Sequence, residues 1–185
     1  MKRAFDLVGA AIGLIVASPL ILILLVLIRR GSDGPGIFSQ ERIGREGARF
    51  RCHKLRTMFA DTPNVPSHNA ASTQITPIGR MLRASKLDEL PQLWNVLKGE
   101  MSFVGPRPCL PSQTLLIEER RKRGVLACRP GITGLAQIND IDMSDPIKLA
   151  DKDEEYTKTQ SLGGDMVILL RTVLGGAGSG DRVRH

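Results

Sequence analysis

The hydrophobic pattern separates an apolar segment at the N-terminus from a mixed remainder. From Leu7 to Ile28 the chain runs for 22 residues without a charged side chain, long enough for one helix to cross the hydrocarbon core of a bilayer. The remainder alternates short apolar runs with polar and glycine-rich stretches. We therefore predict a membrane helix at 1–30, a domain with its own core at 31–174, and a flexible, glycine-rich tail at 175–185.

The apolar segment contains a proline near its middle and is flanked by basic residues at both ends. Pro19 follows Ser18, and a proline inside a helix removes a backbone hydrogen bond, at a cost of about 3 kcal/mol. Lys2-Arg3 precede the segment and Arg29-Arg30 follow it, and the positive-inside rule favours the cytoplasmic side for both pairs. A re-entrant helix that turns at Ser18-Pro19 satisfies both ends. Since prolines also occur in true spans, the segment alone leaves a straight span open.

Beyond the apolar segment the pattern predicts short strands and short helices. Two strands, at 37–40 and 50–54, flank a turn at 44–47 and form a hairpin, and a third strand lies at 101–104. Thr76-Pro77 and Gly99 are typical signals for the start and the end of a helix. The fold class is therefore α+β. Apolar spacing predicts amphipathic surface helices at 77–82, 90–97, 111–123, 146–156 and 166–174, a mobile polar loop at 61–76, and a turn at 129–134.

The amino-acid composition indicates which kinds of molecule the protein is expected to bind. The formal net charge of +7 favours anionic partners, but aromatic residues make up only 4% of the chain, so base stacking on a nucleic acid is not expected. The three cysteines form no C-x-x-C pair and the three histidines do not cluster with them. A disulfide framework and a zinc site are therefore both disfavoured, and the cysteines suit a reducing compartment.

Two adjacent carboxylates, Asp88 and Glu89, stand where the helix at 90–97 is expected to begin. The plain interpretation makes Asp88 a helix cap and Glu89 an ordinary first-turn acid, with Ser85 as an alternative start through a capping box. Three arginines favour a second interpretation, because guanidinium groups in rigid settings bind phosphate in a bidentate manner. They are Arg83 on the preceding helix, Arg107 between two prolines, and Arg129 before Pro130. This combination points to chemistry on a phosphate-bearing substrate at a membrane surface.

The motifs run in an order that resembles a known family. Residues 85–108, SKLDELPQLWNVLKGEMSFVGPRP, are similar to the core signature of the monotopic phosphoglycosyl transferases, the bacterial initiating sugar-1-phosphate transferases of the small single-domain type. The resemblance covers nearly the whole chain. It includes Lys2-Arg3 to Asp6, Ser18-Pro19, the stretches 38–44, 54–58 and 129–139, and Tyr156 with Ser161-Leu162 before Asp165.

The resemblance implies a mechanism and a set of site residues. Asp88 matches the nucleophile of an Asp-Glu dyad with Glu89, and would attack a UDP-sugar, release UMP and hold the sugar phosphate as an acyl phosphate. A polyprenyl (undecaprenyl) phosphate would then take over the sugar phosphate in a ping-pong sequence. Mg²⁺, with Asp88 and Glu89 as its ligands, would share the phosphate charge with the basic residues. The matching substrate-binding residues are Arg83, Arg107, Arg129, Lys54 and Asp153.

The resemblance also implies a place in the cell. It places the chain at the bacterial inner (cytoplasmic) membrane as a re-entrant helix in contact with phospholipids, with the catalytic domain on the cytoplasmic face, and it is compatible with a homodimer. The chain departs from the family at 139–142, where Asn-Asp-Ile-Asp replaces the common Asn-Gly-Arg-Asn and removes an arginine. Leu55 replaces an aromatic residue, and Gly163-Gly164 replaces larger apolar residues. The competing hypothesis is a non-catalytic basic module at the membrane surface that binds anionic lipid or nucleic acid.

Overall fold

The computed structural model describes residues 1–60, 62 and 74–174, and confirms the α+β class. The first helix, α1 (Lys2–Gly31), leads to an antiparallel hairpin of β1 (Ile37–Ile43) and β2 (Arg49–Leu55), joined by the 3-10 turn η1 (Arg45–Gly47). Most of the predicted loop at 61–76 and the predicted tail at 175–185 lie outside the described residues.

Short elements make up the rest of the chain. After Thr76 come α2 (Pro77–Ala84), the 3-10 turn η4 (Leu87–Glu89), α3 (Gln92–Lys98) and β3 (Ser102–Val104). Then follow α4 (Thr114–Lys122), η5 (Val125–Ala127), β4 (Gly131–Thr133), η6 (Gln137–Asn139), α5 (Pro146–Thr159) and α6 (Leu162–Leu174). Strand β4 pairs in parallel with β3, so part of the predicted turn at 129–134 is a strand. Helix α6 starts three residues earlier than Asp165.

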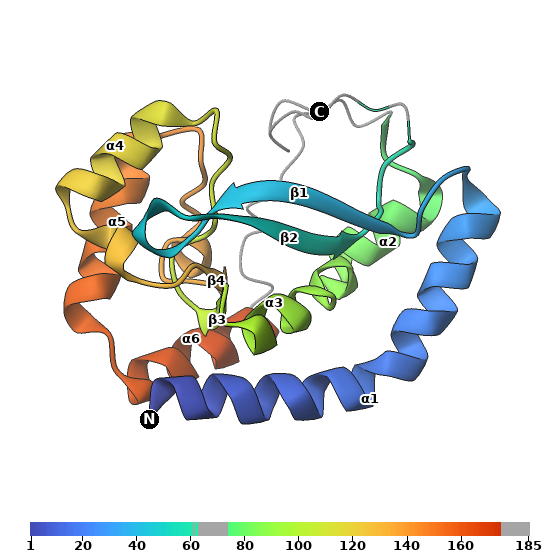
Figure 1. Cartoon of the computed structure of the whole chain (residues 1–185), viewed down its shortest axis with the longest axis horizontal. Helices are drawn as coiled ribbons and strands as arrows, with labels where there is room; N and C mark the ends of the chain where they lie inside the picture. The colour runs from blue at the N-terminus through green and yellow to red at the C-terminus, as the bar shows by residue number, and fades with distance from the viewer. Residues whose placement is uncertain (61, 63–73, 175–185) are drawn as a thin grey trace.

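Helix α1 continues through Pro19 instead of dividing into two helices. It bends in Figure 1, where one arm runs beneath α3 and α6 and the other rises beside the hairpin and α2. The Ser18 hydroxyl donates a hydrogen bond to the carbonyl of Ile15 at 2.9 Å, which is typical of serine in an apolar helix. Among the described residues, α1 is the one helix long and apolar enough to cross a membrane, and most of its apolar side chains are exposed.

Charged side chains at both ends of α1 hold it to the rest of the molecule. At the N-terminal end, Lys2 pairs with Asp165 on α6, and Arg3 donates to the carbonyls of Val96 and Leu97 on α3. At the C-terminal end, Arg56 after β2 donates to the carbonyl of Ser32 at 2.8 Å and also to that of Asp33. Both ends of α1 are therefore bound to the domain, and the helix is an integral part of the fold.

The core of the domain lies between the hairpin and the helices around it. Phe50 and Cys52 of β2 pack with Val96, Met101 and Ala10, which joins the hairpin to α3 and α1. A second cluster includes Leu116 of α4 and Leu149 of α5. In Figure 1 the hairpin lies above α3 and α1, and its turn end reaches α4 and α5. The hairpin contributes Ile43 to the second cluster, so it packs against both groups of helices.

Candidate active site

The two adjacent carboxylates lie in η4, the single turn between α2 and α3. Lys86 just before the turn has a left-handed backbone (φ 56°), which redirects the chain after α2. Helix α3 begins at Gln92 without a side-chain cap, and the Ser85 hydroxyl bonds back to Met81 and Leu82 instead. Asp88 is 4% exposed, so the carboxylate is buried in a turn and is not a helix cap. Both capping interpretations of the sequence are therefore wrong.

Two cations from distant parts of the chain meet the second carboxylate. The Glu89 Oε1 atom lies 3.0 Å from Lys54 Nζ and 3.4 Å from Arg107 Nη1. All three side chains are largely shielded from solvent, which strengthens the interaction between their charges. The hairpin supplies Lys54, and the loop after β3 supplies Arg107. The structure thus brings together Glu89, Lys54 and Arg107 next to Asp88.

The face of the hairpin that carries Lys54 also carries further polar groups. Because Gln40 pairs with Cys52, and Phe38 with Lys54, these side chains share one face with Arg42. Arg42 donates to Gln40 Oε1 at 2.5 Å and to the carbonyl of Pro108 at 3.1 Å. Burial raises the pKa of the Cys52 thiol, while the positive charges of Lys54 and Arg42 oppose that rise. Positive charge therefore concentrates on this face, beside the carboxylates.

Three other residues predicted for the site have different surroundings. Arg83 donates from Nε to the Thr57 hydroxyl at 2.9 Å, and its Nη1 atom is buried without a hydrogen-bond partner in the described part of the chain. Arg129 donates to the carbonyl of Gly99 at 2.9 Å. Asp153 is buried in an ion pair with Arg120 at 2.6 Å. The side chains of Arg129 and Asp153 are thus engaged in internal contacts, whereas one donor atom of Arg83 has no partner among the described residues.

The sequence did not single out Arg42 or Arg120 as part of the site. Arg42 lies in one of the family-like stretches, so the motif at 38–44 could have indicated it. Arg120 lies in a run of charged residues on α4, where alternating signs usually mark a solvent-exposed face. Its 3% exposure distinguishes it from its neighbours, and no local pattern signals that burial.

The carboxylates suit a magnesium ion better than a transition metal. No group of three or more His, Cys, Asp or Glu side chains that could hold a metal occurs within the residues that the structure describes. Mg²⁺ is commonly held by one or two carboxylates, with substrate phosphates and water completing its shell. Asp88 and Glu89 fit that donor set, and the neighbouring cations fit a phosphate-bearing ligand.

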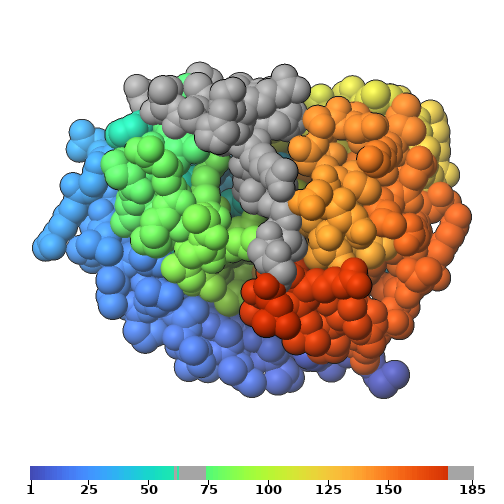
Figure 2. Space-filling view, turned by 180° about the vertical axis from the view of Figure 1, so that it is seen from behind, coloured from blue at the N-terminus to red at the C-terminus, as the bar shows by residue number. Residues whose placement is uncertain are grey.

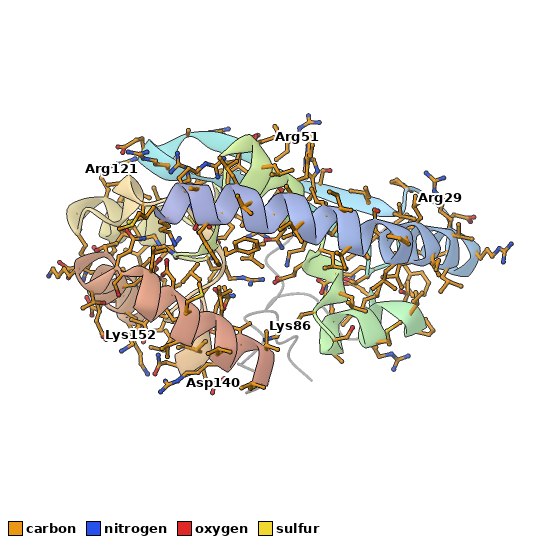
Figure 3. The ribbon with its side chains drawn as sticks, turned by 90° about the horizontal axis from the view of Figure 1, so that it is seen from below. Arg29, Arg51, Lys86, Arg121, Asp140 and Lys152 are labelled. Carbon is orange, nitrogen blue, oxygen red and sulfur yellow. The ribbon has the colours of Figure 1, made fainter. Side chains whose placement is uncertain are left out.

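The stretches of chain around Lys86 and Asp140 both reach the rear face of the molecule (Figure 3). Figure 3 places Lys86 and Asp140 on one side of α1, and Arg51 of β2 and Arg121 of α4 on the other. In Figure 2, which shows the rear face, the green part of the chain that includes η4 lies to one side and the orange part around 140–150 lies to the other. The departure from the family at 139–142 therefore lies on the same face as Lys86, two residues before Asp88.

A buried carboxylate beside a second one that contacts two cations is an arrangement that suits chemistry on anionic groups. The chain belongs to the bacterial sugar transferase family, whose sequence profile matches residues 1–177. The family resemblance drawn from the motifs is thereby confirmed, and the protein is an enzyme of the transferase class.

Several curated relatives match over most of this chain. A protein of Caulobacter vibrioides named UDP-glucose:undecaprenyl-phosphate glucose-1-phosphate transferase is 40% identical over 183 residues, covering 93% of this chain and 68% of the relative. An undecaprenyl-phosphate galactose phosphotransferase of Salmonella typhimurium is 37% identical, covering 93% of this chain but 39% of the relative. The exopolysaccharide production protein ExoY of Rhizobium meliloti is 34% identical, covering 93% of this chain and 83% of the relative. The chain therefore spans about two-fifths of the length of some relatives and most of the length of others.

Proposed function

We propose that the protein transfers a sugar-1-phosphate from a UDP-sugar to undecaprenyl phosphate and releases UMP. The relatives named above as undecaprenyl-phosphate sugar transferases support the substrate class. The observation that carries the proposal is the meeting of Glu89 with Lys54 and Arg107 beside the buried Asp88. A basic module that only bound anionic lipid would have no use for a buried carboxylate with a second, largely shielded one beside it.

The reaction proceeds in two displacements at the sugar-linked phosphorus, with Asp88 as the nucleophile of the first and the leaving group of the second. A carboxylate oxygen of Asp88 attacks the sugar-linked phosphorus, the bond from that phosphorus to the UMP oxygen breaks, and UMP leaves with the electron pair. An oxygen of undecaprenyl phosphate then attacks the same phosphorus and releases the Asp88 carboxylate. Covalent storage of the sugar phosphate allows one site to serve a water-soluble donor and a membrane-bound acceptor in turn.

Several neighbouring residues offset the negative charge of the substrate phosphates. Lys54 and Arg107 offset the negative charge of the phosphate oxygens, and Glu89 holds both cations in place. Arg83 contributes its unpaired Nη1 donor to the nucleotide diphosphate. Asp88 and Glu89 would hold Mg²⁺, which supplies further charge neutralisation when it is bound.

The apolar helix places this chemistry at the bilayer. We propose a re-entrant α1 that enters and leaves the inner membrane on the cytoplasmic side and contacts phospholipids through its exposed apolar side chains. The catalytic domain then lies at the cytoplasmic surface, within reach of the acceptor phosphate. In this setting the product begins the membrane stage of a polysaccharide or another glycoconjugate, and a second copy of the chain could pair in the same bilayer.

The test is a substitution at Asp88. Asp88→Asn keeps the size of the side chain but removes its negative charge, so UMP release from UDP-sugars, Mg²⁺ and undecaprenyl phosphate should fall by at least about a thousandfold. Asp151→Asn, at a largely exposed carboxylate, is the control and should leave the rate unchanged. Mass spectrometry of enzyme mixed with donor alone should find a sugar phosphate on the peptide that contains Asp88. Undiminished turnover by Asp88→Asn would refute this nucleophile, and vesicle binding without any turnover by the wild type would favour the lipid-binding module.

A further inference from the structure

The loop that carries Arg107 has an unusual backbone, because prolines stand on both sides of the arginine. Pro106 and Pro108 have no N–H group, so this part of the chain can form few hydrogen bonds of its own as a donor. Its carbonyls are instead bound from outside. Four consecutive carbonyls, from Pro106 to Cys109, accept hydrogen bonds from Gly131 N at 2.9 Å, Arg120 Nη1 at 2.8 Å, Arg42 Nη1 at 3.1 Å and Ile43 N at 2.9 Å.

Two of the four donors are side chains, and Arg120, which binds the carbonyl of Arg107 itself, is more deeply buried than Arg42. Arg120 is 3% exposed, and its Nε and Nη2 atoms bind Asp153 Oδ2 at 2.9 and 2.6 Å. The third nitrogen, Nη1, is directed at the carbonyl of Arg107. A guanidinium is a planar, rigid fork, so two contacts to Asp153 fix the direction of the third.

The side chain of Arg107 depends on that fixed backbone. Its Nη1 atom reaches Glu89 Oε1 at 3.4 Å, a distance at the outer limit of a hydrogen bond, so a small displacement of the loop would break the contact. Pro106 and Pro108 stiffen the loop, but they do not set its distance from η4. Arg120 links the loop to α4, and Asp153 links Arg120 to α5.

We propose that Arg120, oriented by Asp153, is a positioning residue that sets the place of Arg107 in the active site. Asp153 then acts on the reaction through two other residues, without touching the substrate. This inference rests on the proposed function for its kinetic test, because Arg107 is assigned there to the phosphate group.

The Arg120–Asp153 pair could instead serve only to hold α4 against α5. A second ion pair between the same two helices provides a control for that purely structural role. Arg123, at the C-terminal cap of α4, pairs with Asp151 of α5 at 2.8 Å. It also contacts Glu119 on its own helix, and none of its described contacts reaches the loop at 106–109. Arg123→Lys therefore perturbs the same pair of helices without touching the carbonyl of Arg107.

The kinetic test is a double-mutant cycle. Arg120→Lys and Asp153→Asn should each lower kcat/KM for UMP release by about 10- to 100-fold, as expected for a small displacement of a charged group. In an Arg107→Gln background the same changes should cost less than about twofold, because the group they position is gone. Arg123→Lys should have little effect in either background. Equal losses with and without Arg107 would overturn the proposal.

Hydrogen–deuterium exchange gives a second measurement that does not depend on catalysis. The peptide covering 105–110 should exchange faster in Arg120→Lys than in the wild type, and Arg123→Lys should leave it unchanged. If Arg120→Lys does not fold, Asp153→Asn decides. Its neutral amide keeps the size of the side chain but binds the Arg120 guanidinium more weakly than the carboxylate does, so the same peptide should exchange faster in this variant too. Unchanged exchange in folded Arg120→Lys, or in Asp153→Asn when that variant decides, would refute the positioning role. Absence of UMP release by the wild type would instead refute the proposed function and leave the exchange result to decide the positioning.

Discussion

The hydroxyl of Tyr156 shows how one buried group connects distant elements. It lies 3.0 Å from the carbonyl of Val104 on β3 and 2.9 Å from Asp165 Oδ1 on α6, and it accepts a hydrogen bond from Gln160 at 3.0 Å. Burial raises the pKa of this phenol far above its ordinary range, with the Asp165 charge adding to the rise and the Gln160 bond opposing it. The group therefore stays protonated in the folded protein at any pH in ordinary use.

That shift predicts a loss of stability in alkali. Above about pH 10 the unfolded tyrosine loses its proton while the folded one keeps it, so unfolding releases a proton and the free energy of unfolding falls as pH rises. The slope assigned to this residue is at most about 1.4 kcal/mol per pH unit. Unfolding of wild type and Tyr156→Phe in detergent, followed from pH 8 to 11, should show a shallower decline in the variant. Parallel declines would contradict the assignment.

At the residue scale, the sequence identified the carboxylates and two of the cations around them but not their supports. Asp88, Glu89, Lys54 and Arg107 all lie in local motifs, and a motif is visible without knowledge of the fold. Arg120 acts on a carbonyl 13 residues earlier in the chain, and a backbone carbonyl carries no sequence signal. Hydrogen bonds to distant carbonyls could therefore not be predicted, although they decide where Arg107 lies.

Among the elements, α2 depends on a close approach to Thr57, in the segment that follows β2. The carbonyl of Thr57 accepts from the backbone of Thr76 at 3.0 Å, and the Thr76 hydroxyl caps α2 through Gly79 N, as the Thr-Pro signal predicted. A Cβ atom at Gly79 would lie 2.0 Å from the Thr57 carbonyl oxygen. Glycine is thus required there by space, and α2 positions η4 only because this contact is allowed.

Two glycines in helices consequently respond to alanine in opposite ways. Gly79→Ala should lower the free energy of unfolding by about 1–3 kcal/mol, because α2 must move away from Thr57. Gly163→Ala, in α6 where a Cβ would meet nothing within 4 Å, should raise it by up to about 1 kcal/mol through helix propensity. Chemical denaturation of both variants in detergent provides the comparison. A stabilising effect of alanine at Gly79 would show that α2 does not pack on Thr57 in this way.

Sequence patterns predicted helices and strands correctly where the pattern was a helix cap or an alternation of apolar and polar residues. They failed where contacts with distant parts of the chain determine the local structure. The hairpin, the Thr76 start and the Gly99 stop, whose left-handed backbone (φ 86°) ends α3, are confirmed. Strand β4 is three residues long, and it exists because Gly131 and Thr133 pair with β3, from which they are far away in the sequence. Turn η4 follows from the left-handed Lys86, a conformation that lysine rarely adopts and that no propensity indicates.

For the whole molecule, the decisive feature is that both ends of α1 contact the same body. Lys2 and Arg3 are bound to α6 and α3, and Arg56 binds the chain just after the other end. Asp6 reinforces the first attachment by accepting from the backbone and side chain of β3 at 3.1 Å. A straight span would place a bilayer of about 30 Å between the two ends, and one of the two sets of contacts would be lost.

Cysteine labelling in membrane vesicles tests this arrangement. In a background without Cys52, Cys109 and Cys128, a single cysteine replaces Ala4 or Arg30, exposed residues near the two ends of α1, or Asp151 on the catalytic domain as a marker. If α1 is re-entrant, a membrane-impermeant maleimide should label all three from the same side, because the contacts at both ends keep them with the domain. Labelling of positions 4 and 30 from opposite sides would require a straight span. The Lys2, Arg3 and Asp6 contacts would then have to break in the membrane, and Lys2→Met would leave the stability of the protein there unchanged.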